Sequence, residues 1–290
     1  MTTGGFPDPW KSAGPAWLFC PADRPERYRK AAATADVVIL DLEDGVAPAD
    51  KPAARKALVD TPLDPATTVV RVNPAGTPDH ELDLLALRDT AYQLVMLPKT
   101  ESIHQVTGLS GYQVFALIET PLGALEIQQI AAAPNTRGVM CGVEDLVAAM
   151  GGTGTRRSDG SYRDVALHLR SHGLLAAKAH QRLALDMVYL NIRDLDGLRT
   201  EAEDAVAVGF EIKVAVHPTQ IAVIRAAYAP SAADLDWARG VLAAAPNHRG
   251  VFAYEGRMVD APLLRHAEQI LQRADATAAP AGSGSTPDPD

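Results

Sequence analysis

Cysteine is scarce in this sequence, with two residues, Cys20 and Cys141, among 290. Both lie inside apolar runs, so we expect two buried thiols and no disulfide framework, and neither thiol is a candidate nucleophile. A chain that does without disulfides suits a reducing compartment, and we predict a cytoplasmic protein.

Basic residues and long hydrophobic runs are also scarce in this sequence. Lys and Arg number 27 against 36 Asp and Glu, a formal net charge of −9. Such a chain lacks the positive surface that sequence-independent nucleic-acid binding needs. Charged residues interrupt each apolar run well before the roughly 18 residues of a membrane span, and the first residues lack the apolar core of a secretory signal. We expect neither nucleic acid nor a membrane as a partner.

The chain does contain a repeated alternation of apolar and helix-prone segments. The apolar runs show no polar alternation, which is typical of strands buried on both faces of a parallel sheet. Eight such runs span residues 16–22, 36–44, 67–73, 92–99, 112–120, 136–145, 183–192 and 212–218. Segments of helical composition between them include residues 79–88, 122–133, 164–182 and 195–208.

Two architectures are compatible with this alternation, a closed (β/α)8 barrel and an open, doubly wound sheet. Eight units favour the barrel. Polar side chains gather at the carboxyl ends of the runs, and in a barrel these ends meet at one face, where the active site is built. The dinucleotide-binding form of the open sheet lacks support, because no Gly-x-Gly-x-x-Gly motif follows the first run. We therefore predict a (β/α)8 TIM barrel with a C-terminal helical extension and lid loop.

The extension is predicted from two helical patterns, 232–245 and 262–273, joined by a lid loop at 247–260. Asp260 stands just before Pro262, where it suits the cap of the second helix. The predicted organisation is a flexible N-terminus at 1–14, the barrel at 15–228, the extension at 229–274 and a disordered tail at 275–290.

Glu119 and Asp145 end the fifth and sixth runs and are expected to project into the same mouth. Two carboxylates with few other protein ligands suit Mg²⁺, which keeps positions for water and substrate oxygens. Other assignments stay open here: Asp145 could cap a helix at 146–150, and Glu119 could pair with Arg71 or Lys99.

Arg71 follows two valines in the third run, so its guanidinium is expected to rise from an apolar wall and to need an anion. Its planar fork suits a small organic carboxylate held by two parallel hydrogen bonds. A salt bridge to Glu43 or Glu119 is the structural alternative, and the two roles can coexist.

The second run ends in three acids, Asp41, Glu43 and Asp44. Strand alternation would send Asp41 and Glu43 to one side and Asp44 to the other, so at most two of them are expected to share the mouth. Carboxylates held close together have raised pKa values, which makes one of them usable as a base. A solvated surface cluster is the alternative.

Three further features have weaker signals. Four cations after the first run fit either a solvated helix face or a phosphate site; they are Arg24, Arg27, Arg29 and Lys30. His217 is interpreted as structural, because no partner at ligand spacing surrounds it. The GGTG segment at 151–154 lacks the Lys-Ser/Thr of a phosphate loop and is expected to be a mobile loop near the mouth.

Nine motifs occur in order: LFCPADRPER from Leu18, ADVVILDLEDGV from Ala35, KPAAR from Lys51, VVRVN from Val69, MLPKTE from Met96, ALIETPLGA from Ala116, GVEDL from Gly142, VAVHPTQI from Val214 and GRMVDAP from Gly256. Together they resemble the CitE-type branch of the HpcH/HpaI aldolase and citrate lyase β-subunit superfamily, and especially stand-alone actinobacterial CitE-like acyl-CoA lyases. The resemblance extends from about Pro15 to Leu271. Cys20 stands where the family usually has valine, and Ile212 where a glycine commonly precedes Lys213, which affects packing more than chemistry.

The resemblance implies a (β/α)8 barrel, dependence on Mg²⁺, a homotrimer, and cleavage or formation of a carbon–carbon bond beside an acyl-CoA thioester. By position it implies that Glu119 and Asp145 bind Mg²⁺, with Glu119 also bordering the substrate. It implies that Arg71 holds the keto-acid carboxylate. It makes Asp260 a lid aspartate that reaches the active site of a neighbouring subunit.

The expected function is Mg²⁺-dependent cleavage of citramalyl-CoA or malyl-CoA to acetyl-CoA and an α-keto acid. The CoA nucleotide is expected near Arg24 and Lys30. Proton transfer is assigned to Asp260 at the enolate carbon and to Glu43 or Asp41 at the hydroxyl. The alternatives are a citrate lyase β-subunit acting on a carrier-bound citryl group, a malyl-CoA thioesterase, and a silent barrel that binds CoA thioesters.

Overall fold

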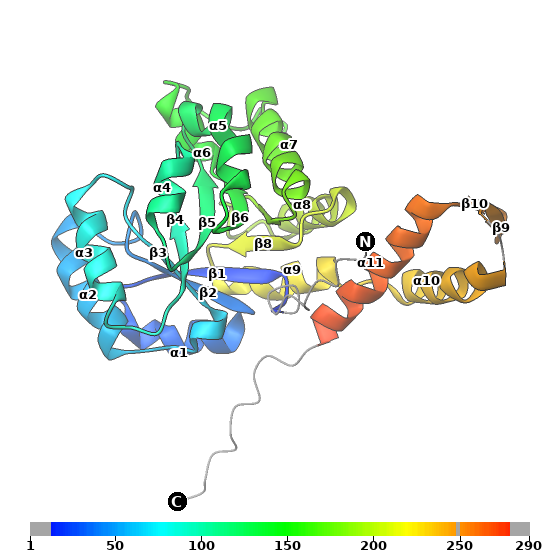
Figure 1. Cartoon of the computed structure of the whole chain (residues 1–290), viewed down its shortest axis with the longest axis horizontal. Helices are drawn as coiled ribbons and strands as arrows, with labels where there is room; N and C mark the ends of the chain where they lie inside the picture. The colour runs from blue at the N-terminus through cyan, green and yellow to red at the C-terminus, as the bar shows by residue number, and fades with distance from the viewer. Residues whose placement is uncertain (1–12, 248–249, 279–290) are drawn as a thin grey trace, which may run out of the picture.

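The computed structural model describes residues 13–247 and 250–278 and is shown in Figure 1. Eight parallel strands close into a barrel in sequential order, with β1 pairing to both β2 and β8. The predicted barrel is confirmed, and the open sheet is excluded. The barrel strands are β1 (Ala16–Pro21), β2 (Val37–Asp41), β3 (Thr68–Arg71), β4 (Leu94–Leu97), β5 (Gln113–Ile118), β6 (Thr136–Cys141), β7 (Leu183–Asp186) and β8 (Ile212–Ala215).

Helices connect the strands and cover the outside of the barrel (Figure 1). They are α1 (Pro25–Thr34), α2 (Lys51–Asp60), α3 (Pro78–Leu87), α4 (Ile103–Gly108), α5 (Pro121–Ala132), α6 (Val143–Ala149), α7 (Asp164–Ala179), α8 (Leu195–Val208) and α9 (Ile221–Tyr228). Local sequence explains several starts: Thr77 and Thr120 cap α3 and α5 by accepting a backbone N–H three residues on, and a proline follows each cap.

The core has two apolar layers, because neighbouring residues of a strand face opposite sides of the barrel wall. One layer fills the lumen, where the rings of Trp17 and Phe115 meet edge to face with centroids 5.1 Å apart. The other layer packs against the helices and includes Leu40 and Val70. Each strand is therefore covered on both faces, which explains the continuous apolar runs in the sequence.

Both cysteines are buried and free, as predicted. Burial raises the pKa of the Cys20 thiol to about 11 and that of Cys141 to about 12. Both thiols stay protonated at neutral pH, so neither is an activated nucleophile.

All eight strands end earlier than the sequence predicts, and β6 and β7 do so by the widest margin. β6 ends at Cys141 and α6 begins at Val143, inside the run predicted as strand to residue 145. β7 ends at Asp186 rather than at residue 192. A short apolar run does not distinguish a strand from a buried helix, which explains why the predicted strands extend too far.

Asp145 lies in the first turn of α6. The alternative that it caps this helix is wrong, since Gly142 is the N-cap residue.

The predicted helical extension follows α9. Its helices, α10 (Ala232–Ala244) and α11 (Ala261–Ala278), pack on each other around Val241 and Ile270. The predicted lid loop contains a two-stranded hairpin, β9 (Phe252–Tyr254) and β10 (Arg257–Val259). Figure 1 shows this hairpin at the far end of the extension, away from the barrel.

The chain ends differ from the prediction in part. Helix α11 runs to Ala278, four residues into the predicted disordered tail, because the alanine-rich segment after Arg273 favours helix. At the other end, Ala13 packs against the lumen layer, and the carbonyl of Gly14 accepts a hydrogen bond from Trp17 Nε1 at 3.3 Å. The remaining residues of the predicted termini, and positions 248–249 of the lid loop, lie outside the described residues.

Within residues 13–247 and 250–278, no helix combines the length and the apolar character that a membrane crossing requires.

Candidate active site

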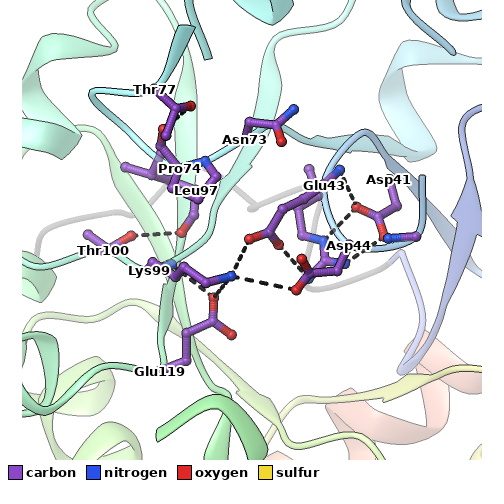
Figure 2. Close-up of polar contacts among 12 residues, drawn as sticks. Asp41, Glu43, Asp44, Asn73, Pro74, Thr77, Leu97, Lys99, Thr100 and Glu119 are labelled. Carbon is purple, nitrogen blue, oxygen red and sulfur yellow. Dashed lines mark hydrogen bonds and ion pairs between the residues drawn. The ribbon is translucent and has the colours of Figure 1, made fainter. Parts of the chain in front are cut away.

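Charged side chains converge at the carboxyl ends of β2 to β5, as the barrel prediction requires (Figure 2). With Asp145 from α6, they form what we call the mouth cluster: Asp41, Glu43, Asp44, Arg71, Lys99, Glu119 and Asp145. Each side chain comes from the last residue of a strand or from the loop or helix after it.

Arg71 is held by Asp41, a partner that the sequence did not suggest. Its Nε and Nη2 atoms donate to the two oxygens of Asp41 at 2.7 and 2.6 Å. The guanidinium also lies over the ring of Phe19, 4.8 Å from the centroid. Burial disfavours the charge, but Asp41 outweighs this and raises the pKa of Arg71. Nη1 lies 3.0 Å from Glu43, and a guanidinium has five N–H groups, so the contacts to Asp41 do not use all of its donors.

Asp41 is fully engaged in positioning its neighbours. Beside the two bonds to Arg71, its oxygens accept the backbone N–H groups of Glu43 and Gly45, each at 2.9 Å. A side chain at Gly45 would collide with the carboxylate, since a Cβ would lie 2.4 Å from Oδ2. This turn ends the strand alternation at Asp41, so three acids, and not two, join the cluster.

Glu43 is buried between the two cations. Its Oε1 binds Lys99 Nζ, and its Oε2 lies 3.0 Å from Arg71 Nη1. The second contact is an ion pair without hydrogen-bond alignment, and within the described residues Oε2 has no other partner. Burial raises the pKa of Glu43, while Arg71 and Lys99 oppose the rise.

Lys99 links three acids that come from two loops, those after β2 and β5. Its ammonium binds Glu43 and lies 3.5 Å from Asp44 and 3.9 Å from Glu119. Burial disfavours the charge, but the bond to Glu43 and the neighbouring acids raise the pKa of Lys99 to about 12. Lys99 is therefore a permanent cation and not a base.

Glu119 is the most perturbed acid of the cluster. Burial, together with the charge of Glu43, raises its pKa to about 8. Its Oε1 accepts the backbone N–H of Lys99 at 2.9 Å. The start of α6 packs directly on it, because a Cβ at Gly142 would lie 2.5 Å from Oε2. This packing brings Asp145 within reach, and its charge also raises the pKa of Glu119.

The mouth cluster is short of positive charge. Five carboxylates face two cations, so three negative charges remain unbalanced when all are ionised. No three His, Cys, Asp or Glu side chains of the described chain form a ready-made metal site. Glu119 and Asp145 together offer two carboxylates and open positions, a donor set that fits Mg²⁺.

A polar support layer lies behind Glu43, and the sequence analysis gave its members no role. Lys51 Nζ donates to the carbonyls of Leu42 and Glu43 at 3.2 and 3.4 Å and also binds Asn73. Asn73 in turn binds the fully buried Asp83 at 2.7 Å. The signal was present in the KPAAR motif, where Lys51 and Arg55 are four positions apart and therefore share one face of the helix, which is buried.

Arg24 and Lys30 lie outside the mouth cluster. Both are exposed, and Arg24 Nε lies 3.5 Å from Asp23. Arg24 is the N-cap residue of α1, shortly after the carboxyl end of β1, so it borders the same face of the barrel, whereas Lys30 lies in the second turn of the helix. His217 has a structural role, as expected. Its Nδ1 contacts the hydroxyl of Thr219 at 2.8 Å and accepts the Thr219 N–H.

Asp260 is not brought to the mouth cluster of its own chain. It follows β10 directly, and its carboxylate accepts the N–H of Leu263 at 3.3 Å at the start of α11, the capping contact expected from the sequence. The catalytic role predicted for Asp260 depends on a neighbouring subunit and stays a prediction.

A second group of charges lies outside the barrel wall, around β7, β8, α7 and α8, and its centre is buried. We call it the flank cluster: Arg156, Arg170, Asp186, Glu201, Asp204 and Lys213. The fully buried Lys213 lies 2.7 Å from Asp186 and 3.5 Å from Glu201, and Arg170 lies 2.6 Å from Asp186. Burial opposes ionisation of Asp186, but Lys213 and Arg170 outweigh it and lower its pKa. Three cations here balance three acids.

Two family models match this chain. The HpcH/HpaI aldolase/citrate lyase model matches residues 16–113 and 109–218, and a model for carbon–carbon bond lyases of the TIM-barrel fold matches 168–278. The chain belongs to the HpcH/HpaI aldolase and citrate lyase family. Membership makes it an enzyme of the carbon–carbon lyase class.

Three relatives show the range of activities in the family. A citrate lyase subunit beta-like protein of Mycobacterium tuberculosis is 62% identical over 91% of this chain and 97% of its own length. The mitochondrial citramalyl-CoA lyase of Homo sapiens is 30% identical over 89% of this chain and 85% of its own length. A (3S)-malyl-CoA thioesterase of Cereibacter sphaeroides is 33% identical over 90% of this chain and 95% of its own length.

Among solved structures, CitE from Mycobacterium tuberculosis superposes with a TM-score of 0.88 at 62% identity, over 91% of this chain and 99% of that one. That crystal contains magnesium, acetoacetate and coenzyme A.

Proposed function

We propose that this chain is a Mg²⁺-dependent lyase that cleaves citramalyl-CoA or malyl-CoA to acetyl-CoA and an α-keto acid. The observation that supports it most is the joint presence, in one mouth, of unbalanced carboxylates and an oriented arginine. The acids suit a divalent cation, and Arg71 suits the carboxylate of the keto acid. The solved relative contains ligands of these same classes.

Arg71 fixes the substrate in this proposal. Asp41 takes one side of its fork, so the guanidinium cannot rotate when the substrate enters. A preoriented donor of this kind stabilises the developing charge without reorganisation. Asp41 accordingly has a positioning part here, in place of the proton transfer assigned to it from the sequence.

The reaction breaks the bond between the hydroxyl-bearing carbon and the carbon next to the thioester. The hydroxyl proton passes to a base, for which we propose Glu43, the buried acid whose pKa is raised. The electron pair moves into the thioester as an enolate, which takes a proton to give acetyl-CoA. We propose Asp260 of a neighbouring subunit as that proton donor, within a homotrimer.

Glu119 and Asp145 would hold Mg²⁺. When bound, the ion supplies Lewis-acid stabilisation of the negative oxygens on the departing keto acid. Glu119 must give up its proton to serve as a ligand, which couples metal binding to pH. We propose that Arg24 and Lys30 receive the phosphates of the CoA nucleotide at the rim.

The direct test is to incubate the purified protein with citramalyl-CoA and Mg²⁺ and to measure pyruvate. Pyruvate should appear, and it should vanish with EDTA and in Glu119→Ala. Inactivity toward both citramalyl-CoA and malyl-CoA, in a folded protein that binds Mg²⁺, would contradict the proposal. Mixing inactive Glu119→Ala and Asp260→Asn subunits should restore part of the turnover if the active site is shared between subunits.

A malyl-CoA thioesterase is the second candidate, because one relative at 33% identity carries that name. Hydrolysis would release malate and CoA from malyl-CoA, whereas the lyase releases glyoxylate and acetyl-CoA. Separating the products of one malyl-CoA reaction distinguishes the two. The citrate lyase role suggested by the name of the 62% identical relative would require cleavage of a citryl group on a carrier protein.

A further inference from the structure

We propose that Lys99 is a positioning residue that couples the two halves of the site, the metal-binding half at Glu119 and the carboxylate-binding half at Arg71. The inference deepens the proposed function and rests on it. The structure supports it by the backbone of Lys99, by its contacts on either side, and by the turn that holds it.

The backbone of Lys99 is in the left-handed region, with φ of 48°. Long side chains rarely adopt this conformation, and glycine adopts it without strain. Non-glycine residues held in this way concentrate at functional sites, where surrounding contacts over-determine them. Residue 99 is therefore a place where a lysine is kept although the backbone favours glycine.

The turn that holds Lys99 is locked on both sides. The hydroxyl of Thr100 donates to the carbonyl of Leu97 at 2.7 Å, and the Thr100 N–H donates to Leu117 on the next strand at 3.1 Å. In this conformation the Lys99 N–H reaches Glu119 Oε1 at 2.9 Å. The same residue thus anchors a proposed metal ligand through its backbone.

The side chain of Lys99 reaches the other half of the site. Figure 2 shows its ammonium between Glu43, Asp44 and Glu119. Glu43 uses one oxygen for Lys99 and directs the other toward Arg71 at 3.0 Å. Glu43 is buried, so losing one of its two cations would leave its charge poorly compensated and its orientation free. The chain of contacts from Glu119 through Lys99 and Glu43 to Arg71 fixes the spacing of the two halves.

The first test is calorimetry on Lys99→Met with two probes, Mg²⁺ alone and pyruvate at saturating Mg²⁺. The backbone N–H to Glu119 survives and a repelling cation is lost, so Mg²⁺ should bind no more weakly than to the wild-type chain. Pyruvate should bind at least about tenfold more weakly, because Glu43 and Arg71 lose their fixed geometry. Lys99→Arg, which retains the charge, should recover most of the pyruvate affinity.

Lys99→Gly separates the backbone from the side chain and guards against misfolding. It relaxes the left-handed turn and retains the N–H, so it should show the pyruvate defect of Lys99→Met together with a higher Tm than that variant. The matched control is Gln181→Gly, an exposed residue with φ of 55° in the turn before β7. It should raise Tm and leave both affinities unchanged.

Wild-type pyruvate affinity in Lys99→Met and Lys99→Gly would overturn the inference, as would loss of Mg²⁺ binding in a folded Lys99→Met protein. The proposed function is tested by a different measurement, pyruvate binding to the wild-type chain. If that chain binds no pyruvate at saturating Mg²⁺, the proposed function and this inference are both overturned.

Discussion

The mouth cluster and the flank cluster contain similar side chains in similarly buried surroundings, yet their acids ionise in opposite ways. The pKa of Glu119 rises to about 8, whereas the pKa of Asp186 falls. Burial pushes both values upward, so burial does not explain the difference. The neighbouring charges do: Lys213 and Arg170 both contact Asp186, whereas Glu119 has, among the described residues, one ammonium at 3.9 Å, and the acids Glu43 and Asp145 raise its pKa further.

This difference distinguishes a ligand-binding site from a structural cluster of ion pairs. A balanced cluster satisfies itself and needs no ligand, so the flank cluster is expected to join β7 and β8 to the helices outside them. An unbalanced cluster retains acids that a ligand must neutralise. Perturbed pKa values mark functional sites when the missing charge can be supplied from outside.

The largest predicted effect is on turnover. Glu119→Gln removes one of the two proposed metal ligands, and the loss of several kcal/mol of transition-state stabilisation should lower kcat/KM for citramalyl-CoA at least about 10³-fold. The measurement is pyruvate release at saturating Mg²⁺. The matched variant in the other cluster, Asp186→Asn, should keep its turnover per folded molecule. Equal losses in both variants would erase the distinction between the clusters.

The second prediction concerns stability. Lys213→Met leaves Asp186 buried without its main cation, which should lower the free energy of unfolding by about 3–5 kcal/mol. Urea denaturation followed by circular dichroism measures this. Lys56→Met is the control, because Lys56 pairs with Asp60 on the surface, and its loss should cost less than about 1 kcal/mol. A Lys213→Met protein as stable as the control would show that the flank cluster does not stabilise the fold.

The third prediction is the pH dependence of stability in the metal-free protein. The pKa of Glu119 rises from 4.5 to about 8 on folding. The stabilisation of the folded state by the protonated Glu119 side chain is therefore complete below pH 4.5 and is lost as the pH rises through 8. The Tm of the wild-type chain should fall relative to that of Glu119→Gln between pH 5 and pH 9, and saturating Mg²⁺ should reverse the trend. A constant difference in Tm would contradict the assigned pKa.

The smallest predicted effect lies at the rim. Arg24→Ala should raise KM for the CoA thioester by less than about tenfold and leave kcat nearly unchanged, because it removes uniform binding. Arg88→Ala, an exposed arginine after α3, is the control and should change neither constant. A comparable fall in kcat would place Arg24 in the chemistry.

The sequence predicted much of this architecture because its signal is physical and local. Eight apolar runs with polar carboxyl ends require a sheet buried on both faces and an active site at one end. The places of Glu119, Asp145 and Arg71 at the ends of these runs indicated them as site residues, and the family resemblance added their expected roles. The hairpin at Glu255 and Gly256 was missed, although a glycine between two short apolar runs suits a tight turn; in the structure both residues have positive φ.

What escaped the sequence is pairing between distant segments. Asp41 and Arg71 are 30 positions apart, and strand alternation alone could not identify their bond or the turn that brings Asp44 into the cluster. Lys99 was noted only as a possible partner of Glu119, because a left-handed backbone at a lysine has no sequence signal. Lys213 likewise gains its partners only when the barrel closes.

The central claim is that Glu119 lacks a cation which Mg²⁺ supplies, and proton release tests it most directly. Mg²⁺ binding is measured by calorimetry at pH 7 in two buffers of different ionisation enthalpy. With the pKa of Glu119 at about 8, binding should release most of one proton per site, and Glu119→Gln should release none. Mg²⁺ binding to the wild-type chain without proton release, or equal release from both proteins, would contradict the account.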